Sequence, residues 1–397
     1  MTGSNRSIGI WSYRAAVITA TLVLAAVIVG NSIGSNASLL PPAQGMSLAP
    51  WDARARLKLA EAELAAGLRA KERLAVAEDL ARQALTRDPT LAAAWRTLGL
   101  AASAQQRPGE ARDILRTAEQ VSRRDLGIQL WLIEDAVQRQ DVVRALHHYD
   151  SALRISLSSR EMLFPILGGA LAQPQMRAPL AAILSRDPPW AEAFYYSLAE
   201  TPPASGALLD LLRQVDRPQL LRSSAPLRIM VANLAGRSDN GAAERVYRML
   251  NPGADAGALL RNGGFERENA VPPLDWQIEQ AGSLAIAQEN GRLLVDGSSG
   301  AGGVIARQAL ALPGGTYRVS FRHGAEDGRV FRPSLLIRCA RTSAALVSID
   351  DAGAADPAGR PFTVPASCSD QVIELQVRSE EGVEPGGWID DVRISRR

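Results

Sequence analysis

The sequence predicts a multidomain protein with an N-terminal transmembrane helix, an α-helical solenoid and a C-terminal antiparallel β-sandwich. Three observations predict this: an uncharged run at 15–34, small residues that recur every 34 positions, and short alternating segments that replace the helical pattern near the middle of the chain. The expected segments are a cytoplasmic N-terminus at 1–14, the membrane helix at 15–34, a linker at 35–50, helical repeats at 51–255 and the sandwich at 258–397.

The composition is that of a folded protein without a strong charge. The chain has 397 residues, of which 46% are apolar and 22% charged, so a wholly disordered chain is excluded and two or three domains fit. The formal net charge is only +2, and no global electrostatic field favours nucleic acid. We therefore expect no nucleic-acid partner.

The uncharged run at 15–34 is long enough to cross a bilayer, which takes about 20 apolar residues in a helix. Arg6 and Arg14 precede it, and the next charge is Asp52. This positive bias places the N-terminus in the cytoplasm. We expect a single-pass protein of the bacterial inner membrane with its bulk in the periplasm. A cleaved signal peptide is the alternative, with residues 35–37 as the small residues at the cleavage site.

The region 51–255 has helical periodicity and an internal repeat. Alanine recurs at a spacing of 34 in two series, and the first helix of the second repeat contains Trp95 and Gly99. The two alanine series are Ala77, Ala111 and Ala145, and Ala84, Ala118 and Ala152. Small residues let paired helices approach closely, so these positions are expected to pack the repeats. The alternative is an unrelated alanine-rich bundle.

This register, with Pro89 ending a helix, resembles the tetratricopeptide (TPR) family over about 58–157. The resemblance implies a superhelix whose concave groove holds a peptide or a protein. An envelope protein partner is therefore the expectation for this region.

From 258 onward, glycine becomes frequent and short strands replace helices. Tyr317, Val319 and Phe321 alternate with polar residues, and the segment 372–378 alternates in the same way. Alternation of this kind indicates strands with one buried face. Several such strands over about 135 residues predict a sandwich or jelly roll.

The ends of this region carry its most specific motifs: Asn-Gly-Gly-Phe-Glu at 262–266 and Gly-Trp-Ile-Asp-Asp-Val at 387–392. Both resemble the galactose-binding-like jelly roll shared by many carbohydrate-binding modules. The resemblance implies that Glu266, Asp390 and Asp391 hold a structural calcium ion, which takes six to eight oxygen ligands. Asp390 and Asp391 would face opposite sides of the strand unless it is bulged. The alternative is a solvated acidic strand end.

The resemblance also implies that exposed aromatic rings stack on sugars. Trp276 and Trp388 are the candidates for glycan contact, and core packing is the alternative for both. They belong to a set of six aromatic residues in the sandwich that could contact a sugar or pack the core: Trp276, Tyr317, Phe321, Phe331, Phe362 and Trp388.

The two cysteines, Cys339 and Cys368, lie in the predicted sandwich outside the cytoplasm, where a disulfide is expected. The histidines are His147, His148 and His323. They are too scattered to indicate zinc, and the first two are expected on the surface of a repeat helix. Calcium is therefore the one cofactor that the sequence suggests.

No catalytic motif is present: the chain has no G-x-S-x-G elbow, phosphate-binding loop, H-E-x-x-H or G-x-G-x-x-G. The leading hypothesis is a non-enzymatic, membrane-anchored scaffold in the assembly or export of a bacterial surface polysaccharide, binding a protein through the repeats. The alternative is a glycan-binding, lectin-like protein that acts through the sandwich. An enzyme with an unrecognised site is a third hypothesis.

Overall fold

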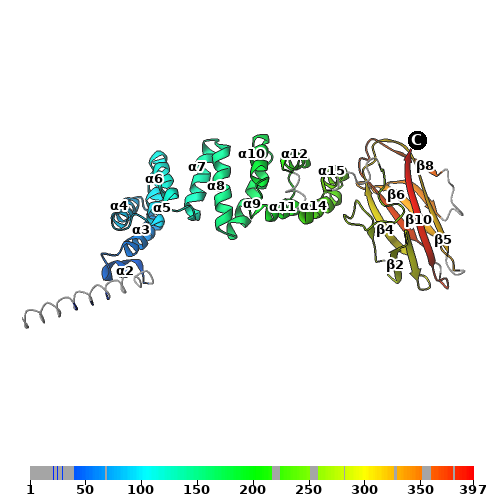
Figure 1. Cartoon of the computed structure of the whole chain (residues 1–397), viewed down its shortest axis with the longest axis horizontal. Helices are drawn as coiled ribbons and strands as arrows, with labels where there is room; N and C mark the ends of the chain where they lie inside the picture. Colours follow the sequence, from blue (N-terminus) through cyan, green and yellow to red (C-terminus); the bar gives the residue numbers. More distant parts are fainter. Residues whose placement is uncertain are drawn as a thin grey trace, which may run out of the picture. The chain divides into compact units, whose positions relative to one another are not determined.

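The computed structural model describes residues 21, 25, 29, 40–67, 69–216, 224–250, 258–280, 282–325, 329–350, 359–378 and 381–397. The chain divides into two compact units, residues 1–159 and 160–397, and each is considered by itself (Figure 1). The predicted membrane helix at 15–34 lies outside the described residues except at three positions. Within the described ranges, no helix is long and apolar enough to cross a bilayer. The membrane anchor therefore stays a prediction without structural support.

The first unit is entirely helical where the structure describes it. Its helices are α2 (Pro42–Leu48), α3 (Ala53–Gly67), α4 (Glu72–Arg87), α5 (Ala92–Ala104), α6 (Pro108–Val121), α7 (Leu126–Gln138) and α8 (Val142–Ile155). Helix α2 lies within the predicted linker at 35–50. Pro42 stands at its first helical position, where a backbone N–H would have no partner within the helix, so the proline is compatible with a helix start. The remaining helices pack as the pairs α3–α4, α5–α6 and α7–α8.

The small residues of the 34-residue spacing lie at the contacts between these helices. All six alanines of the two series are at most 3% exposed. A Cβ atom on Gly99 would stand 2.5 Å from Cγ of Leu115, so no side chain fits there. Trp95 is half-buried and donates a hydrogen bond to the carbonyl of Pro89 at 2.9 Å. The spacing therefore marks helix packing in this unit.

The turns within two of the pairs repeat as well. Gln106 and Gln140 stand 34 residues apart, each just after the first helix of its pair, with φ of 62° and 59°. In both turns the next residue, Arg107 or Asp141, donates its N–H to a carbonyl near the end of that helix, at 3.0 and 2.9 Å. This is the left-handed helix end that usually carries glycine. The repeat is thus visible in the backbone as well as in the packing.

The second unit begins with helices and ends with the sandwich. Its helices are α9 (Ser158–Ala170), α10 (Pro174–Leu184), α11 (Ala191–Glu200), α12 (Ser205–Gln214), α14 (Ser224–Gly236) and α15 (Asn240–Leu250). The strands are β1 (Gln277–Ile278), β2 (Leu284–Glu289), β3 (Arg292–Gly297), β4 (Gly303–Leu310), β5 (Gly315–Ala325), β6 (Pro333–Cys339), β7 (Ala345–Asp350), β8 (Arg360–Val364), β9 (Gln371–Val377) and β10 (Gly386–Arg396).

The strands form two five-stranded sheets, with the orders β1-β4-β9-β6-β7 and β2-β3-β10-β5-β8. All the strand pairs within these sheets are antiparallel. Tyr317, Val319 and Phe321 are buried together with Ile373 and Leu375 in the core between the sheets. The predicted antiparallel sandwich and the buried face of its alternating segments are confirmed.

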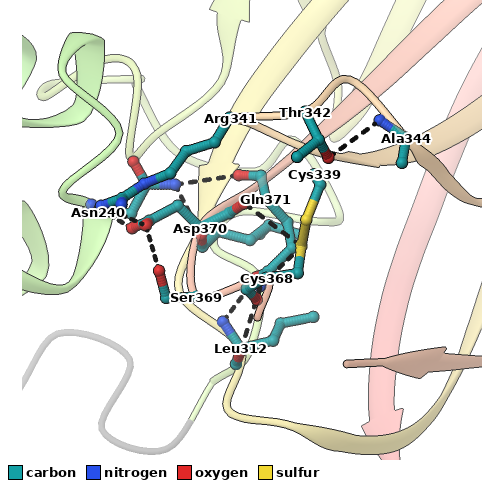
Figure 2. Close-up of a disulfide and its surroundings, with 11 residues drawn as sticks. Asn240, Leu312, Cys339, Arg341, Thr342, Ala344, Cys368, Ser369, Asp370 and Gln371 are labelled. Atoms are coloured by element: carbon teal, nitrogen blue, oxygen red, sulfur yellow. Dashed lines mark hydrogen bonds and ion pairs between the residues drawn. A yellow bond between two sulfur atoms is a disulfide. The ribbon is translucent and has the colours of Figure 1, made fainter. Parts of the chain in front are cut away.

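The predicted disulfide is also confirmed. Cys339 ends β6 and Cys368 lies just before β9, and their Cα atoms are 5.7 Å apart (Figure 2). The bridge fixes the segment that enters β9. In this segment Gln371 accepts a hydrogen bond from the N–H of Leu312 at 2.8 Å and donates to its carbonyl at 3.2 Å.

The same segment attaches helix α15 to the sandwich (Figure 2). Asn240, at the start of α15, is 1% exposed. Its backbone N–H donates to Oδ1 of Asp370 at 2.7 Å, and its side-chain Nδ2 donates to the carbonyls of Leu310 and Gln371 at 2.7 and 3.0 Å. One asparagine thus satisfies two buried carbonyls at the ends of neighbouring strands.

A second contact holds the other end of α15. Tyr247 donates to the carboxylate of Asp275 at 3.4 Å, and the guanidinium of Arg261 lies 4.2 Å from the centre of the Tyr247 ring. Burial raises the pKa of Asp275 above the ordinary range, although the hydrogen bond from the N–H of Val271 opposes this. The last helix of the chain is therefore part of the sandwich's own packing.

Candidate functional site

The outer face of the sheet β2-β3-β10-β5-β8 carries a half-buried tryptophan at its centre. Trp388 on β10 stands opposite Leu294 of β3 and Gly324 of β5. The next residue, Ile389, is fully buried in the core, so the alternation of the strand directs Trp388 outward. A Cβ atom on Gly324 would lie 2.7 Å from atoms of the indole ring. The glycine therefore makes room for the ring to lie against the sheet.

The guanidinium of Arg292 covers the same ring. Its Cζ atom lies 4.3 Å from the centre of the Trp388 ring, within the range of a cation–π contact. Arg292 itself is exposed. The indole thus lies between Gly324 and a solvent-facing arginine.

Two pairs of opposite charge flank the tryptophan along the strands. Arg322 of β5 and Asp390 of β10 stand opposite each other and pair at 2.9 Å. Arg329 pairs with Asp296 of β3 at 2.6 Å. The face therefore offers guanidinium donors and carboxylate acceptors on both sides of an aromatic ring.

A bulge in β10 brings both predicted calcium carboxylates to one arginine. The register of β10 shifts between Asp390 and Arg393, and Asp391 has φ of 54°. Asp390 and Asp391 consequently both reach Arg322, at 2.9 and 3.2 Å, and Asp391 also pairs with Arg393 at 2.5 Å. The bulge that a shared site requires is present, but the charges are balanced by arginine.

Glu266 does not join these aspartates in a ligand group. Among the described residues, the one set of three His, Cys, Asp or Glu side chains close enough to share a metal ion lies elsewhere, in the first unit. Glu266 instead lines a pocket at the β2–β3 hairpin. Calcium binding by Glu266 with Asp390 or Asp391 stays a prediction, and both aspartates form ion pairs with arginines.

This pocket has a volume of about 640 Å³. It is lined by Phe265, Glu266, Arg267, Glu268, Asn269, Ile278, Gln288, Glu289, Asn290 and Gly291. Asn269 donates to the side chain of Gln288 at 2.8 Å, and Gln288 donates to the carbonyl of Phe265 at 2.8 Å. The hairpin runs from the pocket lining at Gly291 directly to Arg292 above the indole. The turn between β2 and β3 therefore contributes both to the pocket lining and, through Arg292, to the cover of the indole.

Trp276 is not a glycan contact. It is 0% exposed, stacks on Phe265 at 5.4 Å between ring centres, and donates from Nε1 to the carbonyl of Asn262 at 3.0 Å. A Cβ atom on Gly263 would lie 2.0 Å from the carbonyl oxygen of Val392. The motif at 262–266 therefore packs the domain, and the interpretation of Trp276 as a sugar platform is wrong.

Four other aromatic residues of the sandwich are buried as well: Tyr317, Phe321, Phe331 and Phe362. Of the six candidate rings, only Trp388 is partly exposed. Arg292, Gly324 and Arg322 were not among the predicted site residues. The sequence offered one signal, the isolated Gly324 within an alternating strand. A glycine there indicates that another group lies close to the backbone of the strand.

Comparison with known proteins finds similar solved structures for the sandwich alone. No family model and no curated protein match the chain. Among solved structures, the sandwich is similar to a carbohydrate-binding module, CBM61, in complex with beta-1,4-galactotriose, at 18% identity, and to a CBM4 module, at 19%. Each match covers 35% of this chain and 99% of the module, with a TM-score of 0.26. At this identity and TM-score, the two matches do not indicate a ligand for this chain. The resemblance of the helical region to the tetratricopeptide family is not confirmed.

Proposed function

We propose that the C-terminal sandwich is a non-catalytic carbohydrate-binding domain and that the glycan lies across the face around Trp388. The supporting observation is a partly exposed indole with an Arg–carboxylate pair on each side, Arg322–Asp390 and Arg329–Asp296. This agrees with the lectin-like alternative drawn from the sequence.

A sugar presents an apolar face of C–H groups and an edge of hydroxyls. The flat ring of Trp388 suits the former, since aromatic rings bury large apolar areas in fixed geometry. Guanidinium groups donate to hydroxyl oxygens and carboxylates accept from hydroxyl protons, as in sites where few polar groups set specificity. The polar pocket at the β2–β3 hairpin gives room for further sugar units.

Arg292 has to leave the ring before a sugar can stack on it. A cation–π contact at an exposed site contributes about 0.5–1 kcal/mol, which is about two- to fivefold in affinity. Removing this side chain exposes the ring without disturbing the core. Arg292→Ala is therefore expected to strengthen binding of a neutral glycan by about that factor.

Trp388→Ala is expected to weaken glycan binding at least tenfold, because stacking on the indole is lost while the charged pairs remain. The full chain is first screened on an array of neutral and acidic polysaccharides that includes β-1,4-galactan. Affinity for the strongest hit is then measured by isothermal titration calorimetry. Trp51→Ala, which removes a tryptophan 53% exposed in the first unit, is the matched control. Equal affinities of wild type and Trp388→Ala, or no glycan bound at all, would overturn the assignment.

The helical array supports a second proposal, that of a membrane-anchored scaffold in envelope polysaccharide assembly or export. Arg96 of α5 pairs with Glu61 of α3 at 2.7 Å and with Asp125 at the start of α7 at 2.5 Å. The first helices of three successive pairs are thus tied along one line. Such an arrangement offers a continuous surface to an envelope protein.

Ala111→Phe tests the scaffold proposal in the full chain. Ala111 is fully buried, so a bulky side chain overpacks the array at a cost of roughly 1–3 kcal/mol. A partner captured from envelope extract by wild type should be lost with this variant and retained with Trp388→Ala. The reverse pattern, loss with Trp388→Ala alone, would mean that the sandwich holds the partner and the array does not.

A further inference from the structure

Three side chains that bind metals in other proteins converge between helices α6, α7 and α8 of the first unit. Glu119 comes from α6, and His147 and His148 come from α8. One ligand atom from each lies within 4.8 Å of the others. His148 is only 4% exposed, whereas His147 is exposed and Glu119 half-buried. The expectation that both histidines lie on the helix surface is therefore wrong for His148.

The buried imidazole already has the contacts of a metal ligand. Nδ1 of His148 lies 3.3 Å from Oε1 of Glu119 and 2.9 Å from Oε1 of Gln129. Two ligands at about 2.0–2.1 Å from a tetrahedral zinc ion lie about 3.3 Å from each other. The Glu119–His148 pair therefore has the spacing of ligands in such a site.

Gln129 of α7 holds the carboxylate of Glu119. It is 0% exposed, and its Nε2 donates to Oε1 of Glu119 at 3.3 Å. Outer hydrogen bonds of this kind fix the orientation of the ligands around a metal and are worth 10–100-fold in affinity.

We propose that Glu119, His147 and His148 bind one divalent transition-metal ion, with zinc as the probe. Two imidazole nitrogens and one carboxylate oxygen are the ligand types that zinc takes, and they leave a fourth position for water. When Nδ1 of His148 binds the ion, the proton of the neutral imidazole sits on Nε2, so the ring stays neutral and no proton is lost from it. Exposed His147 closes the site from the solvent side, so the ion ties the second helix of one pair to the second helix of the next.

A hydrogen-bonded cluster that binds no metal makes different predictions for the variants. If the cluster only satisfies a buried imidazole, His147 has no part in it, because the contacts join His148 to Glu119 and Gln129 alone. His147→Ala then changes nothing. If the cluster binds zinc, removing His147 takes away one of three ligands. His147→Ala therefore separates the two cases. Because His147 is exposed, this substitution leaves the fold intact, and circular dichroism checks this.

The test is zinc titration of the full chain after removal of metals with a chelator, followed by isothermal titration calorimetry and thermal melting. Wild type should bind one zinc ion per chain and melt at a higher temperature with zinc than without. His147→Ala and Glu119→Gln should each weaken binding at least tenfold and abolish the shift. Asp113→Asn removes an exposed carboxylate from the same helix, α6, and should bind like wild type.

Two results would overturn the site. One is the absence of zinc binding by wild type at micromolar concentrations. The other is binding that persists unchanged in both His147→Ala and Glu119→Gln, which would place the ion at other groups.

Discussion

Replacing Cys339 and Cys368 with serine is expected to lower the free energy of unfolding of the sandwich by about 3–4 kcal/mol. The disulfide joins positions 29 residues apart, and a closed loop of that length restricts the unfolded chain by about this amount in the chain-entropy model. The effect should be local to the sandwich. Hydrogen exchange measured by mass spectrometry on the full chain reports it through the amides of β6 and β9.

Chemical reduction of the wild-type chain gives the independent comparison for this prediction. The reduced protein should show the same loss of protection as the double serine variant, because both lack the same cross-link. Ser348→Ala, on neighbouring strand β7, should leave protection unchanged. Equal protection in oxidised and reduced wild type would show that the bridge adds nothing to stability.

Asn240→Ala is expected to detach helix α15 from the sandwich and to cost about 1–3 kcal/mol, the sum for two lost hydrogen bonds. The carbonyls of Leu310 and Gln371 both accept from its Nδ2 inside the protein, and each of these hydrogen bonds contributes about 0.5–1.5 kcal/mol. Amides of α15 should then exchange faster with solvent than those of α14. The measurement is again hydrogen exchange on the full chain.

The matched control for this variant is Asn233→Ala. Asn233 of α14 also donates its Nδ2 to a carbonyl, that of Ala199, at 2.7 Å, but this contact lies among the helices. Its loss should cost about 0.5–1.5 kcal/mol and should not alter protection at the contact between α15 and the sandwich. Unchanged exchange of α15 in Asn240→Ala would show that the apolar packing holds the helix without the asparagine.

Features that depend on local periodicity could be predicted from the sequence. Alternation along a strand decides which side chains are buried, so Tyr317 and Val319 were placed correctly. A spacing of 34 marks helix contacts because equivalent residues meet equivalent neighbours, as the buried Ala111 and Ala145 show. Because the chain has two cysteines and both lie in the predicted sandwich, one intramolecular disulfide was possible, and the structure has it.

Features that depend on contacts distant in sequence could not be predicted. Asn240 meets Asp370 across 130 residues, and no local pattern distinguishes it from a surface asparagine. Gln106 and Gln140 adopt a left-handed conformation that usually indicates glycine, so these turns gave no signal. The site was partly predictable: Ile389 belongs to the core, and alternation alone would have turned Trp388 outward.

The position of Asn240 decides where the C-terminal module could be exchanged between genes. The change in composition near 257 suggests a module that begins at 258, yet a segment cut there leaves behind the asparagine that satisfies Leu310 and Gln371. A recipient protein would lose the side-chain hydrogen bonds to both carbonyls and the backbone N–H that donates to Asp370. The smallest heritable segment that keeps these groups satisfied therefore begins upstream of α15, and recombination within 240–258 is expected to be selected against.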